Sequence, residues 1–180
     1  MNRNLPNILT TLRMLVIPVF LYYLYLSRVP GQILICLVIF VLASLTDYLD
    51  GALARKYNVI SNYGKIMDPL ADKLLVLAAL SGITWLMPYR LPALIFILIF
   101  ARELIITILR EIYKQRGIIV AADKLGKLKT VMQMLGLIAA YSVWAFSSPS
   151  PIFVTVITLW FWLVTGITLY SGVNYLRIKA

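Results

Sequence analysis

Six long apolar stretches, separated by short connections, dominate this sequence of 180 residues. Hydrophobic residues make up 62% of the chain and charged residues only 13%, whereas soluble domains carry about 25% charged residues. A water-soluble particle of this size needs more polar surface than this composition supplies. The composition therefore excludes a soluble globular enzyme and a disordered chain. It predicts an integral membrane protein, because each spanning helix needs roughly 20 mainly apolar residues.

The predicted fold is all-α, with six transmembrane helices and a short N-terminal interfacial helix formed by residues 4–13. The second span is expected to continue as a helix to residue 55. Because the connections are short and no second domain is visible, we expect residues 1–180 to form a single membrane domain. The predicted spans are residues 14–27, 32–45, 69–88, 91–112, 128–146 and 152–175.

The basic residues are distributed unevenly between the two sets of span ends. Fourteen of the 17 Lys and Arg residues fall on one side, Arg28 and Arg90 fall on the other, and Arg102 lies inside the fourth span. Since basic residues concentrate in cytoplasmic loops, we expect both termini to be cytoplasmic in a multi-pass protein of the cell inner (cytoplasmic) membrane.

The basic excess also bears on the partners of the chain. With 17 basic and only 7 acidic residues, the chain can attract nucleic acid, anionic lipid or an anionic substrate. The apolar bulk argues against nucleic acid and favours anionic membrane lipids. The residues expected to face lipid headgroups are Lys114, Arg116, Lys124 and Lys127.

The side chains that could hold a metal are limited in kind. The sequence has no His, and its single Cys, Cys36, lies in an apolar run. This excludes an intrachain disulfide and a thiolate zinc cluster. Any bound metal must therefore have oxygen ligands, which favours a hard cation such as Mg²⁺ or Mn²⁺.

Four of the seven acidic residues gather at the predicted cytoplasmic ends of the second and third spans, namely Asp47, Asp50, Asp68 and Asp72. Spacings of three and four residues place each pair on one face of a helix. Four neighbouring carboxylates repel each other unless cations bind between them. Two metal ions about 3.5–4 Å apart are a recurrent solution in phosphoryl chemistry. An EF-hand is excluded, because the alternating loop pattern is missing.

The residues around the aspartates suit a phosphate-bearing ligand. Gly51 allows close approach of a ligand, and Ala54 keeps the same helix face bare one turn later. Arg55 carries a guanidinium fork that suits phosphate oxygens, and Gly64 leaves space before Asp68. The alternative is that the aspartates only pair with neighbouring basic side chains. Four aspartates at helix-face spacing beside glycines favour the metal site.

Together these residues resemble the signature of the CDP-alcohol phosphotransferase family. The pattern is D-x-x-D-G-x-x-A-R, a gap of eight residues, and G-x-x-x-D-x-x-x-D, and all eight fixed positions are present between Asp47 and Asp72. Less specific stretches outside this pattern, such as Arg102-Glu103 and Ser171-Gly172, resemble the subgroup that forms phosphatidylglycerophosphate.

The resemblance implies a reaction and a role for each motif residue. CDP-diacylglycerol is attacked at its β-phosphorus by a hydroxyl of sn-glycerol 3-phosphate, and CMP leaves. The four aspartates surround two divalent ions, Mg²⁺ or Mn²⁺, and Asp72 also takes the hydroxyl proton. Arg110 and Lys129 bind the acceptor phosphate, and the enzyme is a homodimer. The residues implied at the cytidine diphosphate site are Gly51, Ala54 and Arg55, with Gly64 nearby.

Arg102 and Glu103 lie inside the fourth span, where charges are costly and are usually paired or functional. One interpretation is an ion pair between them, or between Glu103 and another basic residue. The other is a cationic pocket, with Arg110 and Lys129, for the acceptor phosphate.

Other functions stay open at this point. The same fold and donor can serve another acceptor: inositol phosphate, serine or phosphatidylglycerol. A cation transporter is a second class, but transport sites lie near the bilayer midplane between repeats, whereas these acids lie at one edge. A membrane anchor without activity leaves the four aspartates unexplained.

Overall fold

The structure is a computed structural model that describes residues 5–57, 62–115 and 124–176. Every regular element in these ranges is helical, which confirms the predicted all-α fold. The helices in chain order are α1 (Leu5–Leu21), the π-helical turn η1 (Tyr22–Leu26), α2 (Gln32–Tyr57), α3 (Asn62–Trp85), α4 (Ala93–Gln115), α5 (Lys124–Phe146) and α6 (Pro151–Leu176).

The N-terminal region differs from the prediction. A separate interfacial helix is not seen, because α1 runs without a break from Leu5 to Leu21 and η1 follows it directly. No Gly or Pro lies between residues 8 and 17, so nothing in this segment interrupts the helix. Pro18 lies inside α1. A proline removes one backbone hydrogen bond from the ladder, and the π-helical turn begins four residues later.

Residues 1–82 and 141–147 belong to one compact unit, called unit 1 below. Its core contains the last turns of α5, where Tyr141 is only 1% exposed. The Tyr141 hydroxyl donates a hydrogen bond to the carbonyl of Ala79 over 3.0 Å, and its ring packs against Phe20. Tyr25 of η1 also bonds to Ser81 of α3 over 2.9 Å. These contacts fix the second half of α3 against the N-terminal helices.

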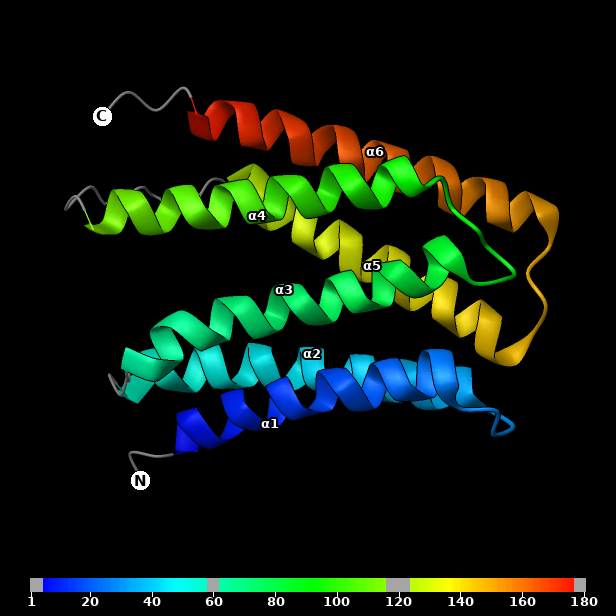
Figure 1. The fold of residues 1–180 in the computed structure, drawn as a ribbon, viewed down its shortest axis with the longest axis horizontal. Helices are drawn as coiled ribbons and strands as arrows, with labels where there is room; N and C mark the ends of the chain where they lie inside the picture. Colours follow the sequence, from blue (N-terminus) through cyan, green and yellow to red (C-terminus); the bar gives the residue numbers. More distant parts are fainter. Residues whose placement is uncertain (1–4, 58–61, 116–123, 177–180) are drawn as a thin grey trace. The chain divides into compact units, whose positions relative to one another are not determined.

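Residues 83–140 and 148–180 belong to the other compact unit, unit 2. Within it, α4 and α6 pack side by side (Figure 1). The Trp160 indole Nε1 donates to the carbonyl of Met132 over 3.0 Å and so ties α6 to α5. Gly136 permits this close approach, because a Cβ there would lie 2.7 Å from the Trp160 ring.

Large apolar side chains are exposed along most of the helices, as for Leu15 (61%), Leu26 (73%) and Ile152 (77%). By length and composition, two stretches of the described chain could each cross a membrane, residues 125–146 and 151–173. Shorter apolar helical stretches cover residues 11–26, 32–46 and 73–85. These features are consistent with the predicted membrane protein, while they do not fix the number of spans at six.

Candidate active site

The aspartate motif is divided between two consecutive helices of unit 1. Asp47 and Asp50 lie in the second half of α2, and Asp68 and Asp72 lie in the first half of α3. Both pairs are on continuous α-helix, as the sequence predicted. The spacing within each pair therefore places its two members on one face of their helix.

The two pairs also lie at similar levels along their helices. Because α2 ends at Tyr57 and α3 begins at Asn62, only residues 58–61 connect the two helices, and α3 runs back from the end of α2 (Figure 1). A helix rises about 1.5 Å per residue, so Asp47 and Asp72 each lie about 15 Å from the connection, and Asp50 and Asp68 each lie about 10 Å from it. The backbone thus gives the four aspartates matching levels on one helical hairpin.

The side chains of the eight motif residues are not among those that the structure describes. Their metal-binding and substrate-binding roles therefore stay predictions. The donor set on the two helices, four carboxylates, fits hard divalent cations. Among the side chains that are described, no group of three or more His, Cys, Asp or Glu residues gathers. The eight residues are Asp47, Asp50, Gly51, Ala54, Arg55, Gly64, Asp68 and Asp72.

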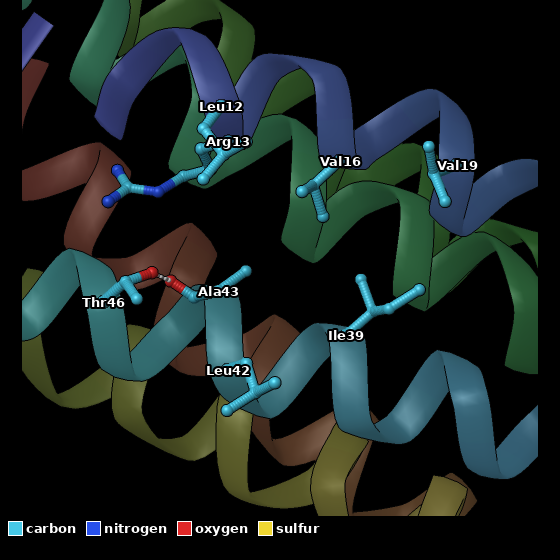
Figure 2. Close-up of a pocket in the computed structure, with 8 residues that line it drawn as sticks. All are labelled: Leu12, Arg13, Val16, Val19, Ile39, Leu42, Ala43 and Thr46. Carbon is cyan, nitrogen blue, oxygen red and sulfur yellow. Dashed lines mark hydrogen bonds between the residues drawn. The ribbon is translucent and has the colours of Figure 1, made fainter. Parts of the chain in front are cut away.

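A groove of about 230 Å³ lies between α1 and α2 next to the motif (Figure 2). Its lining is apolar apart from Arg13 and Thr46. Figure 2 shows these two residues at the same end of the groove, and Thr46 directly precedes Asp47 in α2. One end of the groove is therefore lined by the residue that directly precedes the motif in α2. Its lining residues are Leu12, Arg13, Val16, Val19, Ile39, Leu42, Ala43 and Thr46.

The two residues predicted to bind the acceptor phosphate lie in unit 2 and differ in exposure. Arg110 is exposed near the C-terminal end of α4. Lys129, in α5, is only 4% exposed, and its Nζ donates a hydrogen bond to Glu103 Oε1. Their role toward a phosphate is a prediction that these contacts do not test.

Glu103 also forms the ion pair that the sequence left as one interpretation. Its Oε1 accepts a hydrogen bond from Arg102 Nη1 over 3.0 Å. Arg102 in turn contacts α6, through Nη2 to Ser171 Oγ over 3.0 Å and through Nε to the carbonyl of Thr168 over 3.2 Å. We call Arg102, Glu103, Lys129, Thr168 and Ser171 the Glu103 cluster.

Sequence reasoning missed the contribution of α6 to this cluster. Arg102 and Ser171 are 69 positions apart, so no local spacing could reveal their contact. The available signal was Gly172, since a Cβ at this position would lie 3.3 Å from Arg102 Cγ. A glycine beside a serine in an apolar helix can mark the place where another helix or a long side chain approaches.

A comparison with known protein families shows to which family the chain belongs. The family model described as CDP-alcohol phosphatidyltransferase matches residues 3–168. The chain belongs to the CDP-alcohol phosphatidyltransferase family. This confirms the resemblance that the aspartate motif indicated, and it places α1 to α5 and most of α6 within the CDP-alcohol phosphatidyltransferase region.

Relatives in this family are similar to the chain over most of its length. A CDP-diacylglycerol–glycerol-3-phosphate 3-phosphatidyltransferase of Rickettsia prowazekii is 35% identical, over 98% of this chain and 95% of the relative. The protein of the same name from Bacillus subtilis is 40% identical, over 76% of this chain and 75% of the relative. A probable phosphatidylglycerophosphate synthase of Mycobacterium tuberculosis is 38% identical, over 96% of this chain and 79% of the relative.

Proposed function

We propose that this chain transfers a phosphatidyl group from CDP-diacylglycerol to sn-glycerol 3-phosphate, giving phosphatidylglycerophosphate and CMP. The observation that carries the proposal is the similarity to the Rickettsia prowazekii relative along 98% of this chain, because that relative is named for this transfer. The complete aspartate motif between Asp47 and Asp72 supports the same chemistry.

Metal dependence is part of the proposal. We infer that Asp47, Asp50, Asp68 and Asp72 hold two Mg²⁺ or Mn²⁺ ions, because their eight carboxylate oxygens are the ligands that hard cations prefer. When bound, such ions neutralise the donor's diphosphate and stabilise the charge on the departing CMP oxygen. The matching levels of the two aspartate pairs on α2 and α3 support a shared site.

Asp72 has a second role, toward the acceptor proton, and the other motif residues act on the donor. The Asp72 carboxylate takes the proton of the acceptor hydroxyl as the hydroxyl oxygen bonds to the β-phosphorus. The bond from that phosphorus to the bridging oxygen breaks, and its electron pair leaves with CMP. Arg55 holds the diphosphate through its guanidinium fork, while Gly51, Ala54 and Gly64 leave room for the cytidine diphosphate.

The identity of the acceptor is tested by comparing four candidate acceptors. Arg110 and Lys129 supply two positive charges for a phosphate, which favours glycerol 3-phosphate over an uncharged alcohol. Purified protein is given CDP-diacylglycerol, Mg²⁺ and one of four acceptors: glycerol 3-phosphate, inositol phosphate, serine or phosphatidylglycerol. We expect kcat/KM to be highest with glycerol 3-phosphate. A higher value for another acceptor would reject this subgroup and keep the fold, and cation flux without CMP release would favour the transporter.

We infer that the chain is one domain with six spans in the cell inner membrane and with both termini in the cytoplasm. The support is the uneven distribution of Lys and Arg. Single cysteines introduced by Asn2→Cys or Ala180→Cys, in a Cys36→Ser background, should react with an impermeant thiol reagent only after the cells are permeabilised. Reaction of either cysteine in intact cells would contradict this orientation.

We propose that the groove between α1 and α2 receives one acyl chain of the donor. Its apolar lining suits a hydrocarbon chain, and its Thr46 end adjoins the motif that binds the anionic headgroup. The Ile39→Trp substitution should fill the groove and raise the KM for long-chain CDP-diacylglycerol about tenfold, the equivalent of about two buried methylene groups. The KM for a short-chain donor should change little.

A matched control for this prediction is Val38→Trp. Val38 is the neighbouring residue of α2, it is 47% exposed, and it does not line the groove. This variant should keep the wild-type KM for both donors. Equal effects of the two tryptophans, or an Ile39→Trp effect on both donor lengths, would contradict the proposed acyl site.

The family resemblance also supports a homodimer that contacts anionic membrane lipids. The mass of the active protein in detergent tests the dimer directly. A fully active species with the mass of one chain would contradict it.

A further inference from the structure

Glu103 is the only described residue of its cluster that carries negative charge, and it serves two cations from different helices. The same oxygen, Oε1, accepts hydrogen bonds from Arg102 on α4 and from Lys129 on α5. Arg102 continues the connection to Thr168 and Ser171 on α6. One carboxylate thus links the three helices of unit 2 through its partners.

The charged side chains of the cluster are largely buried, so each charge needs its charged partner to offset the cost of burial. Glu103 is 8% exposed and Lys129 is 4% exposed. A buried charge is costly unless it is paired and hydrogen-bonded. Removing one partner of a buried ion pair leaves the other uncompensated. The position of the Lys129 ammonium is therefore expected to depend on Glu103.

Two buried polar groups of unit 2, one of them on a residue of the cluster, have no hydrogen-bond partner among the described residues. They are the Gln133 amide nitrogen and the Thr168 hydroxyl. Gln133 lies four residues after Lys129, so both are on the same face of α5. Since buried polar groups normally have partners, these two groups are candidates for a hydrogen bond to a ligand or a water.

We propose that Glu103 is a positioning residue for the acceptor. Its carboxylate holds the Lys129 ammonium in place for the acceptor phosphate, and it aligns Arg102 against α6. This inference rests on the proposed function, which assigns Lys129 to that phosphate. Glu103 itself does not touch the substrate, because a carboxylate repels a phosphate.

The test is the Michaelis constant for each substrate in Glu103→Gln, which keeps the shape of the side chain and removes its charge. We expect the KM for glycerol 3-phosphate to rise about tenfold, while the KM for CDP-diacylglycerol stays near the wild-type value. Glu103→Asp keeps the charge and should restore part of the affinity. Glu111→Gln is the matched control, because Glu111 is an exposed carboxylate on the same helix.

A double-mutant cycle separates positioning from a merely structural role. In a Lys129→Met background, Glu103→Gln should cause no further rise in the KM for glycerol 3-phosphate, because the group that it positions is already gone. If Glu103→Gln does not yield folded protein, Glu103→Asp carries the test and must show a smaller shift in the same direction.

The possible outcomes distinguish this inference from the proposed function on which it rests. Wild-type protein that does not use glycerol 3-phosphate overturns both. Wild-type protein that uses glycerol 3-phosphate, with a Glu103→Gln variant whose KM is unchanged, overturns the positioning role alone. So does a Glu103→Gln effect that is equal for both substrates or that adds fully to the effect of Lys129→Met.

Discussion

Replacing Asp72 by Asn should lower kcat by about 10²–10⁴-fold, the usual contribution of a positioned general base. Asn has nearly the same shape as Asp, but its amide cannot take the proton of the acceptor hydroxyl. The substitution also removes one of the four predicted metal ligands. The measurement is the rate of CMP release at saturating CDP-diacylglycerol and glycerol 3-phosphate over a series of Mg²⁺ concentrations.

Matched substitutions separate the base from the ligands. Asp47→Asn and Asp68→Asn should also lower the rate, and higher Mg²⁺ or Mn²⁺ should restore part of it, because these variants mainly lose metal affinity. The Asp72→Asn rate should stay low at every metal concentration. EDTA should abolish turnover by the unaltered protein. Full activity in EDTA would contradict the two-metal proposal. Equal recovery of all three variants would contradict the assignment of Asp72 as the general base.

Arg55→Ala and Arg110→Ala should weaken the binding of different substrates. A charge-assisted contact to a phosphate contributes roughly 1.5–3 kcal/mol, which corresponds to a change in affinity of roughly ten- to a hundredfold. Arg55→Ala should raise the KM for CDP-diacylglycerol by this factor and leave the acceptor almost unchanged. Arg110→Ala should show the reverse pattern, as should Lys129→Ala.

The opposite effects of the two substitutions on the two KM values are more informative than a loss of activity in either variant. Both arginines are replaced by the same residue, so each variant serves as the control for the other. Parallel rises in both constants would indicate a general structural effect. An unchanged KM for glycerol 3-phosphate in both Arg110→Ala and Lys129→Ala would place these residues outside the acceptor site.

The helices could be predicted from the sequence because their signals are local. Long apolar runs and the breaks at Pro30-Gly31 and Ser147-Ser148 separate the elements. The three- and four-residue spacings of the aspartates are likewise local, so the sequence alone placed Asp47 and Asp50 on one helix face and Asp68 and Asp72 on another. The continuous backbone of α2 and α3 confirms these helices.

The missed features depend on contacts between distant segments. The groove requires Val16 of α1 to lie opposite Ile39 of α2, which helix periodicity does not determine. The partner of Glu103 was left open because Arg102 is its neighbour in the chain, while Lys129 is 26 positions away. Both cations bind it, and only the packing of α4 against α5 and α6 could reveal this.

Reconstitution of the purified chain with CDP-diacylglycerol, glycerol 3-phosphate and Mg²⁺ tests the central claim most directly. The two products, CMP and phosphatidylglycerophosphate, are quantified in the same reaction. Our account predicts equal amounts of both, and neither product when glycerol 3-phosphate or Mg²⁺ is left out. Release of CMP without glycerol 3-phosphate, or no phosphatidylglycerophosphate in the complete reaction, would contradict it.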